Sequence, residues 1–265
     1  NIGYAHHAFG QVSHHDVVSW TSIITGYVEY GYGEEAIECF EIMQFEGICP
    51  NYVTFVAILK ACSSMGAINK GIKVHIEIER KGLLHVTVVA NMLIDMYGKC
   101  GALTKSQEIF SMLPIRDVVT WSILINAYLQ HGYGNESLHC FEQMQLEGIS
   151  PNAVTFVYGL KACSSIGALD NGREMHEQID RRGSFERDLV ILNALVDMYA
   201  RCGCLAKALV VFDQIFIRDV CSWNSLITGY TQHDFGKEAV ECFQQMQQEG
   251  ICPNEVTFIC TLNAC

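Results

Sequence analysis

Proline and charged residues are scarce in this sequence. Four of its 265 residues are proline and 17% are charged, whereas 50% are hydrophobic. A chain with that much apolar surface buries a large core on folding, so the composition excludes intrinsic disorder. The scattered glycines leave no linker or low-complexity tract that would separate dissimilar domains. One architecture is therefore expected from end to end.

Long apolar runs and targeting segments are also lacking. The longest uncharged segment, 118–135, contains hydroxyl, amide and imidazole side chains that are costly in hydrocarbon. We therefore expect no membrane span. The chain begins at Asn1, and no signal or transit sequence precedes the patterned region. The compartment cannot be read directly from the sequence.

Metal-binding motifs are absent although the chain has thirteen cysteines. Most of these cysteines recur at matching places in copied segments, which favours core packing in a reducing compartment over disulfides. The two recurring sets are Cys39, Cys140 and Cys242, and Cys62, Cys163 and Cys265. Cys202 and Cys204 form a C-x-C pair with no second pair, so we expect no metal and no other cofactor.

Catalytic motifs are missing as well. His75 and Glu77 spell H-x-E, but a zinc deaminase also needs a C-x-x-C segment, which the sequence does not contain. There is no glycine-rich phosphate loop and no nucleophile elbow. The chain is not expected to be an enzyme.

What the sequence does contain is a repeat of about one hundred residues. Trp20, Trp121 and Trp223 are spaced by 101 and 102 residues, within the copied strings DVVSWTSIITGY, DVVTWSILINAY and DVCSWNSLITGY. A second type of segment reads VTFVAILKACSSMGAINKG and VTFVYGLKACSSIGALDNG, and a third reads NMLIDMYGKCGALTKSQEIF and NALVDMYARCGCLAKALVVF. Each large unit therefore contains three smaller repeats.

Each smaller repeat predicts two helices. Apolar residues recur at helical spacing in two runs separated by GYG: Trp20, Ile23, Ile24, Tyr27 and Val28, then Ala36, Ile37, Phe40 and Met43. Gly47 is placed to cap the second helix, and Pro50 prevents its continuation. A lone helical hairpin cannot cover its apolar faces, whereas stacked hairpins bury a continuous core. We therefore predict an all-α protein, an α-solenoid superhelix of tandem helix-turn-helix repeats.

The predicted repeats span 17–51, 52–86, 87–117, 118–152, 153–188, 189–219 and 220–254. Their lengths cycle through 35, then 35 or 36, then 31 residues. Residues 1–16 read as the second half of a short repeat, because Phe9 precedes Asp16 as Phe110 precedes Asp117. Residues 255–265 read as the first helix of another repeat. We therefore expect the sequence to be a fragment of a longer array.

Two repeat families fit this pattern. Tetratricopeptide arrays have nearly the same offsets, but they place glycine four residues after the tryptophan and have a uniform length of about 34 residues. This chain has Ile24, Ile125 and Ile227 at that offset. A tetratricopeptide-like scaffold for protein–protein interaction stays open as the alternative function.

The three quoted motif types and their ordered cycle strongly resemble the pentatricopeptide repeat (PPR) family of plant organelles, specifically its subclass of alternating P, L and S repeats. The resemblance covers essentially the whole chain. It implies sequence-specific binding of single-stranded RNA, one base per repeat. It also implies a specificity module of an RNA-editing or RNA-processing factor in the mitochondrion or chloroplast, with editing-complex proteins as further partners.

The resemblance assigns base reading to the fifth and last residues of each repeat. The polar pairs are Thr21 with Asn51 and Ser122 with Asn152 for A, Asn91 with Asp117 and Asn193 with Asp219 for U, and Asn224 with Asn254 for a pyrimidine, preferably C. The L repeats offer the weak pairs Val56 with Val86 and Val157 with Asp188. The implied target is 5′-A-n-U-A-n-U-Y-3′. An aspartate suits the N3 proton of uracil and an asparagine suits the bare N3 of cytosine.

The resemblance also assigns the second residue of each repeat to sandwiching the bases. These residues are Val18, Val53, Val88, Val119, Val154 and Val190, with Cys221 as a departure. Outside the family context the valines are ordinary packing residues. The residues with helix capping as their alternative role are Asn51, Asn152, Asn254, Asp117 and Asp219.

The net charge of −12 opposes binding to phosphates. Local cations recur at equivalent places, namely Lys60, Lys161, Lys99 and Arg201, with surface salt bridges as their alternative role. Many acidic residues, such as Glu35, Glu41 and Glu46, fall on the predicted second helix. That helix faces away from the inner groove in this architecture.

Overall fold

A computed structural model describes residue 9 and residues 14–183 and 188–264. Within those residues it contains fifteen α-helices, one short 3₁₀ helix and no strand. We call the first helix of each predicted repeat an A helix and the second a B helix.

The A helices are α2 (Val17–Glu29), α4 (Tyr52–Met65), α6 (Thr87–Lys99), α8 (Val118–Gln130), α10 (Ala153–Ile166), α12 (Leu189–Arg201), α14 (Val220–Gln232) and α16 (Glu255–Asn263). The B helices are α3 (Gly33–Phe45), α5 (Ile68–Arg80), α7 (Leu103–Met112), α9 (Gly134–Leu146), α11 (Leu169–Arg182), α13 (Leu205–Asp213) and α15 (Gly236–Gln248). The 3₁₀ helix η1 (Leu83–His85) follows α5. Every A helix begins at the first residue of a predicted repeat.

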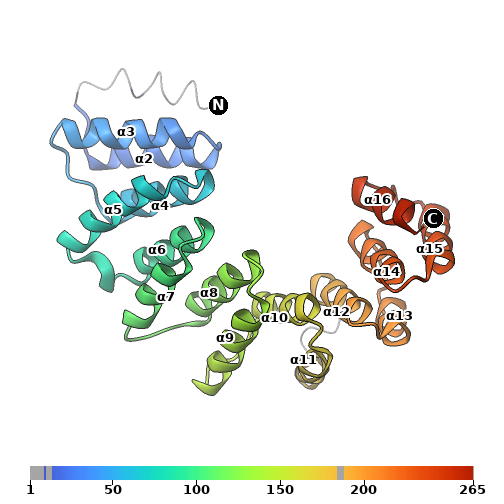
Figure 1. Cartoon of the computed structure of the whole chain (residues 1–265). Coiled ribbons are helices and arrows are strands. Elements are labelled where there is room, and N and C mark those ends of the chain that lie inside the picture. Colours follow the sequence, from blue (N-terminus) through green and yellow to red (C-terminus); the bar gives the residue numbers. More distant parts are fainter. Residues whose placement is uncertain (1–8, 10–13, 184–187, 265) are drawn as a thin grey trace. The chain divides into compact units, whose positions relative to one another are not determined.

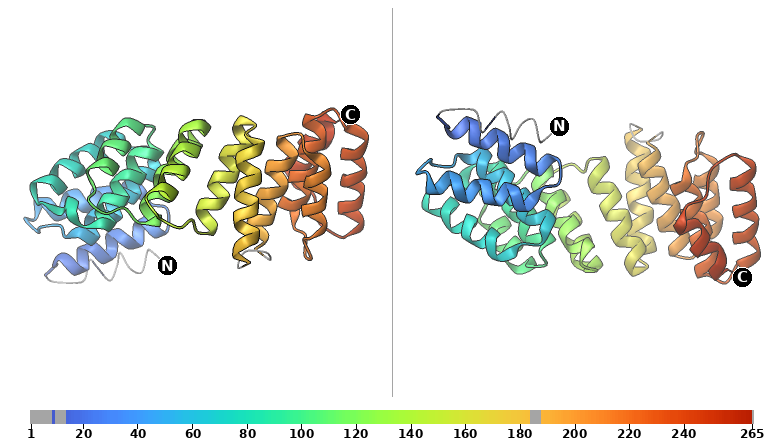
Figure 2. Two further views of the ribbon diagram at one scale, coloured as in Figure 1. Left: turned by 90° about the horizontal axis from the view of Figure 1, so that it is seen from below. Right: turned by 90° about the horizontal axis from the view of Figure 1, so that it is seen from above.

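The chain forms two compact units, residues 1–131 and 132–265. In the first unit α2, α4, α6 and α8 pack on one another in that order, and α10, α12, α14 and α16 do so in the second (Figure 1). Each B helix packs against the A helix that follows it, which gives each unit an A layer and a B layer (Figure 2). Tandem helical hairpins stacked in this way are the predicted α-solenoid fold.

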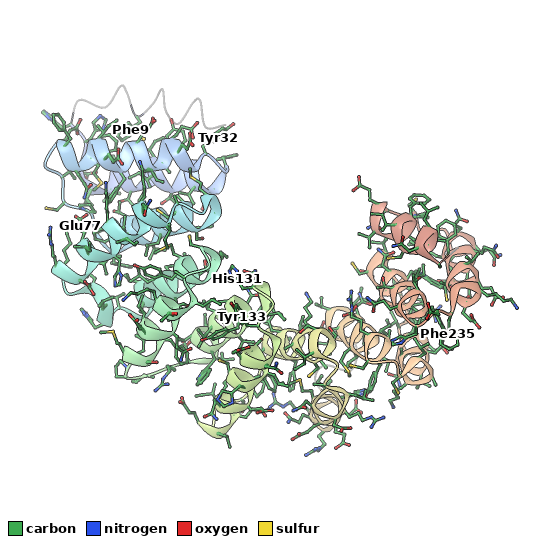
Figure 3. All side chains as sticks on the ribbon, in the orientation of Figure 1. Phe9, Tyr32, Glu77, His131, Tyr133 and Phe235 are labelled. Atoms are coloured by element: carbon green, nitrogen blue, oxygen red, sulfur yellow. The ribbon has the colours of Figure 1, made fainter. Side chains whose placement is uncertain are left out.

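The turns between helices follow from local sequence. Gly47, which we expected to cap α3, follows the C-cap residue Glu46 and has a φ of 76°, a conformation that glycine adopts without strain. Aromatic rings close the hairpin turns: Tyr32 lies 6.3 Å from Tyr27, and Phe235 lies 6.4 Å from Tyr230, between ring centroids. Tyr32, Tyr133 and Phe235 are labelled in Figure 3. Each of the three is the N-cap residue of a B helix.

The tryptophans that mark the repeat are core residues. Trp121 packs edge to face on Phe110 at 4.6 Å, and Trp223 packs on Phe212 at 4.8 Å. Phe9 makes the same contact with Trp20 at 4.7 Å. The rest of the predicted partial repeat at 1–16 lies outside the described residues, apart from 14–16. The same aromatic pair therefore recurs wherever a short repeat precedes a long one.

The cysteines in the described part of the chain are free. Cys62 and Cys163 are fully buried, and burial raises the pKa of Cys62 to about 11 and of Cys163 to about 12. Buried neutral thiols of this kind act as small apolar side chains, as predicted. Cys265 of the same set lies outside the described residues. None of the helices in the described ranges combines the length and hydropathy needed to cross a bilayer.

Neighbouring A helices approach closely where glycine faces alanine. A Cβ added to Gly98 on α6 would lie 2.7 Å from the Cβ of Ala127 on α8, and one added to Gly229 on α14 would lie 2.3 Å from that of Ala200 on α12. Gly98 and Ala200 occupy the same position in their repeats, as do Ala127 and Gly229. Each interface therefore has room for one methyl group, on either helix.

This arrangement predicts that Gly98→Ala is destabilising, although alanine favours helices by about 1 kcal/mol over glycine. We expect the overpacked interface to lower the free energy of unfolding by about 1–3 kcal/mol, measured by urea denaturation. The double variant Gly98→Ala, Ala127→Gly moves the methyl group across the interface and should recover most of the loss. Stability equal to or above the parent in Gly98→Ala alone would contradict this reading of the interface.

Candidate nucleic-acid interface

The last residue of a predicted repeat caps the A helix of the next one. Six of these side chains accept a hydrogen bond from a backbone N–H in the first turn: Asn51, Asp117, Asn152, Asp188, Asp219 and Asn254. Val86 occupies the same place before α6 without a side-chain bond. The alternative interpretation as helix caps is therefore correct for Asn51, Asn152, Asn254, Asp117 and Asp219, and Asp188 is a cap as well. Capping uses one oxygen and leaves the second carboxylate oxygen, or the amide nitrogen, for a ligand.

Two fifth residues of the first unit, Thr21 and Asn91, contact the next A helix. The Thr21 hydroxyl donates to the carbonyl oxygen of Val17 at 2.6 Å and lies 2.7 Å from the hydroxyl of Thr54. The Thr54 hydroxyl also lies 3.0 Å from Oδ1 of Asn51, so it links the fifth and last residues of the first repeat. The hydroxyl of Thr120 donates to Oδ1 of Asn91 at 2.9 Å. Both fifth residues are thus held by the A helix that follows them.

In the second unit the predicted fifth and last residues touch each other. Asn193 donates from Nδ2 to Oδ1 of Asp219 at 3.1 Å, while its own Oδ1 accepts from the hydroxyl of Ser222 at 2.7 Å. One repeat later Asn224 donates from Nδ2 to Oδ1 of Asn254 at 3.1 Å. The structure therefore brings together two of the predicted reading pairs.

The remaining pairs differ. Between Asn91 and Asp117 the link is indirect, through the hydroxyl of Thr120, which lies 2.9 Å from Oδ1 of each. Ser122 belongs to the first unit, where its hydroxyl donates to the carbonyl oxygen of Val118 at 2.5 Å. Its predicted partner Asn152 belongs to the second unit.

The carboxyl group of Asp219 is held in its ionised form. Burial raises its pKa, but hydrogen bonds from the backbone N–H of Ser222 and from the Asn193 amide, with the Ser222 hydroxyl 2.9 Å from Oδ1, outweigh burial and lower it overall. At neutral pH both oxygens of Asp219 are therefore acceptors. Oδ1 is used by the cap and by Asn193, which leaves Oδ2 as an acceptor for a ligand.

The second-position residues are exposed, although they are apolar. Val18 and Val190 have 64% and 63% of their surface exposed. The others in this set are also exposed: Val53, Val88, Val119, Val154 and Cys221. Packing in the core therefore does not account for the recurring valines. The fifth residues are less accessible than the second-position residues. Thr21, Asn91, Ser122 and Val157 are buried, and Val56, Asn193 and Asn224 are half-buried.

Charge is divided unequally between the helix layers. Across the described helices, the A helices carry four acidic and four basic side chains, whereas the B helices carry sixteen acidic and nine basic ones. Glu35 and Glu41 lie on α3, and Glu46 is its C-cap; Glu77, labelled in Figure 3, lies on α5. The acidic net charge therefore resides mainly in the B layer.

The four recurring cations of the A layer are exposed. Lys99 pairs with Asp95 at 2.8 Å and Arg201 with Asp197 at 2.7 Å, so the salt-bridge interpretation is correct for these two. Lys60 and Lys161 form no ion pair with any residue that the structure describes.

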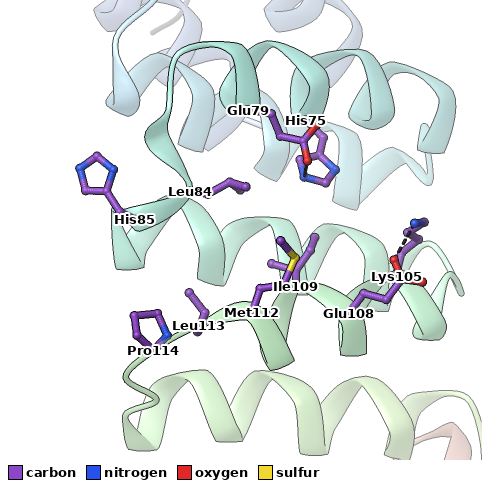
Figure 4. Close-up of a pocket in the computed structure, with 10 residues that line it drawn as sticks. All are labelled: His75, Glu79, Leu84, His85, Lys105, Glu108, Ile109, Met112, Leu113 and Pro114. Atoms are coloured by element: carbon purple, nitrogen blue, oxygen red, sulfur yellow. Dashed lines mark hydrogen bonds and ion pairs between the residues drawn. The ribbon is translucent and has the colours of Figure 1, made fainter.

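A cavity of about 290 Å³ lies between α5, η1 and α7 (Figure 4). His75 on its wall is bonded through Nδ1 to the hydroxyl of Tyr97 at 2.9 Å, and burial lowers its pKa. Lys105 and Glu108 pair with each other at 2.6 Å. Glu77 of the H-x-E string accepts instead from Gln44 at 2.6 Å. Nε2 of His75 has no hydrogen-bond partner and lies 3.5 Å from a carboxylate oxygen of Glu79. The other polar groups named above have partners of their own, and we place no site there.

Sequence reasoning missed the third residue of each repeat. Thr54, Thr120, Ser222 and Thr257 are fully buried, and each contacts the fifth residue of the preceding repeat. The available signal was the alternation of these hydroxyl residues with Val89 and Ile191 at the same position.

A family model described as "PPR repeat family" matches residues 15–64, 116–165 and 218–265, and one described as "PPR repeat" matches 53–83, 88–118 and 190–219. The chain belongs to the PPR repeat family. Among curated relatives, the pentatricopeptide repeat-containing protein CRR2, chloroplastic, of Arabidopsis thaliana is 35% identical over 100% of this PPR chain. The chain spans 41% of that relative's length.

Two solved structures resemble this PPR chain. A tetratricopeptide repeat protein from Parabacteroides merdae matches 94% of the chain and 98% of its own length, with 14% identity and a TM-score of 0.56. The pentatricopeptide repeat protein PPR10 in complex with an 18-nt psaJ RNA element matches 94% of the chain and 52% of its own length, with 18% identity and a TM-score of 0.40. The first likeness concerns the fold of stacked helical hairpins, which the two repeat families share.

Proposed function

We propose that this PPR chain binds single-stranded RNA at the N-terminal ends of its A helices, one base per repeat, and does not itself catalyse a reaction. The observation that carries the proposal is the contact between fifth and last residues in Asn193–Asp219 and Asn224–Asn254. Each contact holds two polar side chains together at the start of an A helix. The exposed second-position valines supply apolar faces beside them for the bases.

The Asn193–Asp219 pair is complementary to uracil. Oδ1 of Asn193 is occupied by Ser222, so its amide presents a free N–H, while Oδ2 of Asp219 presents an acceptor. The Watson–Crick edge of uracil offers an N3 proton next to carbonyl oxygens. Cytosine would place the lone pair of N3 against the carboxylate. Asn91 and Asp117 carry the same groups in the first unit and are proposed to read U as well.

The Asn224–Asn254 pair presents donors only. Oδ1 of Asn254 accepts the backbone N–H of Thr257 and the amide of Asn224, which leaves its Nδ2 for a ligand. Two adjacent N–H groups match N3 and O2 of cytosine, both of which are acceptors. This repeat is therefore proposed to read a pyrimidine, with C preferred.

In the Thr21–Asn51 and Ser122–Asn152 pairs the fifth residue presents the acceptor and the last residue the donor, the reverse of Asn193–Asp219. The proton of Thr21 is committed to Val17, so its hydroxyl faces a ligand as an acceptor, and Nδ2 of Asn51 is a donor. Adenine offers a donor at N6 and an acceptor at N1, which matches this order. Ser122 with Asn152 has the same groups and is proposed to read A. Val56 with Val86 and Val157 with Asp188 are proposed to discriminate little.

The proposed target is 5′-A-n-U-A-n-U-Y-3′, and the proposed role is the specificity module of an organellar RNA-editing or RNA-processing factor with alternating P, L and S repeats. The ordered cycle of repeat lengths supports the P, L and S assignment. A relative whose name includes "chloroplastic" supports an organelle as the compartment. Mitochondrial residence and binding to editing-complex proteins belong to the proposal as well.

Fluorescence anisotropy with short labelled RNAs tests this function. The chain should bind an oligonucleotide containing A-n-U-A-n-U-Y about tenfold or more tightly than a scrambled version of the same composition, since each correctly read base contributes about 1–3 kcal/mol. A tetratricopeptide-like scaffold for peptides would ignore both RNAs. Equal affinity for the two RNAs, or binding to neither, would refute the proposed function.

A further inference from the structure

The third residue of each repeat is matched to the fifth residue of the repeat before it. Where the fifth residue is polar, the next third residue has a hydroxyl group, as in Thr21 with Thr54, Asn91 with Thr120, Ser122 with Thr155, Asn193 with Ser222 and Asn224 with Thr257. Where the fifth residue is Val56 or Val157, the next third residue is Val89 or Ile191. All seven third residues are fully buried. The pattern therefore separates the predicted strong readers from the weak ones.

The hydroxyl groups matched to an asparagine contact its side chain directly. Thr120 lies 2.9 Å from Oδ1 of Asn91, Ser222 lies 2.7 Å from Oδ1 of Asn193, and Thr257 lies 2.6 Å from Oδ1 of Asn224. An asparagine amide has two chemically different ends, and rotation by half a turn exchanges donor for acceptor. A buried hydroxyl on the oxygen end therefore decides which end faces outward.

The direction of these bonds follows from the remaining partners. The backbone N–H of Asp219 donates to the hydroxyl oxygen of Ser222 at 3.2 Å, and the N–H of Asn254 donates to that of Thr257 at 3.1 Å. Oδ1 of Asp219 also lies 2.9 Å from the Ser222 hydroxyl, but it already accepts the Ser222 backbone N–H and the Asn193 amide. Of the two contacts, the one to Oδ1 of Asn193 is shorter, at 2.7 Å, and we assign the hydroxyl proton to it. The amide nitrogen is left to donate to Asp219 and to a ligand.

We propose that the third-position hydroxyl is a positioning residue for base reading where the preceding fifth residue is asparagine: it holds the amide oxygen of that asparagine inward, so that the N–H faces the base. This inference rests on the proposed function. It also accounts for the weak repeats, because an asparagine placed at position 56 or 157 would be followed by the apolar Val89 or Ile191 and would lack this partner.

Ser222→Ala is the direct test, with binding measured to RNAs that carry U, C, A or G at the sixth base. The variant keeps the backbone N–H that bonds to Asp219 and removes the hydroxyl. We expect the preference for U over the other bases to fall by about threefold to tenfold at that base alone, the range expected for one hydrogen bond. Ser222→Thr should keep the preference, because Thr257 makes the same contact.

A purely structural role gives a different result. In that case Ser222→Ala would lower the melting temperature and weaken binding to every RNA equally, and the ratio between U and the other bases would not change. An unchanged ratio would overturn the positioning role while leaving the proposed function intact. If the parent chain shows no preference for U at the sixth base, the proposed function fails first and the positioning role fails with it.

A gain of function tests the inference a second way. Val56→Asn with Val86→Asp installs a uracil-reading pair in an L repeat, and Val89→Thr adds the missing hydroxyl. We expect the triple variant to prefer U at the second base by about threefold or more over the double variant. Circular dichroism should find both variants folded. Equal discrimination by the double and triple variants would overturn the proposal.

Discussion

Asp219→Asn should change the base read by its repeat from U to C. The substitution replaces the acceptor Oδ2 by an amide that donates, so the pair becomes Asn193 with an asparagine, the same groups as in Asn224 with Asn254. Asparagine is as good an N-cap as aspartate, so α14 should keep its start. The group that faces N3 of the base is then a donor instead of an acceptor. We expect the ratio of the affinity for U to the affinity for C at the sixth base to change by about tenfold or more in favour of C, measured by anisotropy.

The chain supplies a reciprocal control for this exchange. Asn254→Asp converts the neighbouring pair into a copy of Asn193 with Asp219 and should shift the seventh base from C to U. Preferences at the other bases should stay unchanged in both variants, since each pair is confined to its own repeat junction. Loss of affinity for all RNAs without a change of preference would show that these residues act as caps alone.

Phe212→Ala should be among the most destabilising single substitutions in the second unit. Phe212 is 4% exposed, packs edge to face on Trp223 at 4.8 Å, and has the guanidinium of Arg218 over its ring at 4.5 Å. Truncation leaves a cavity in a core that cannot close around it and removes both ring contacts. We expect the free energy of unfolding to fall by about 3–5 kcal/mol.

Phe216→Ala is the matched control, because Phe216 lies four residues later in the same repeat and is 98% exposed. Its removal should change stability by less than about 0.5 kcal/mol. Urea denaturation followed by far-ultraviolet circular dichroism compares the two variants with the parent. Because stacked hairpins need not unfold in one step, the variants are compared over the whole denaturation curve and not by a single midpoint. Similar stability of the two variants would contradict the role assigned to the Phe212–Trp223 pair.

The helices could be predicted from the sequence because the repeats contain clear signals for the start and end of each helix. Each tryptophan or VTF string marks the start of an A helix, and Gly47 with Pro50 marks the end of a hairpin. The division into two units at residue 131 has no such signal. The segment LQHGYG around it closely resembles VEYGYG at 28–33. Local sequence determines where each helix begins and ends, whereas packing between helices that are distant in sequence determines where one compact unit ends.

The candidate site could be predicted in part. The periodic pairing of Thr21, Asn91 and Asn193 with later polar residues pointed to a shared function, but periodicity does not tell which atoms meet. The contact of Ser222 with Asn193 spans 29 residues and depends on the spacing between two A helices. No local pattern encodes that spacing, so the buried hydroxyl groups were visible only as helix-start residues.

The division of charge between the layers bears on how a strand would be discriminated. Since the A helices have as many acidic as basic side chains, a bound strand would release few counterions, and little of its affinity would come from the backbone. Nearly all of it would come from the bases. Such a surface would leave most transcripts unbound, because a strand with the wrong bases would find almost nothing else to hold it.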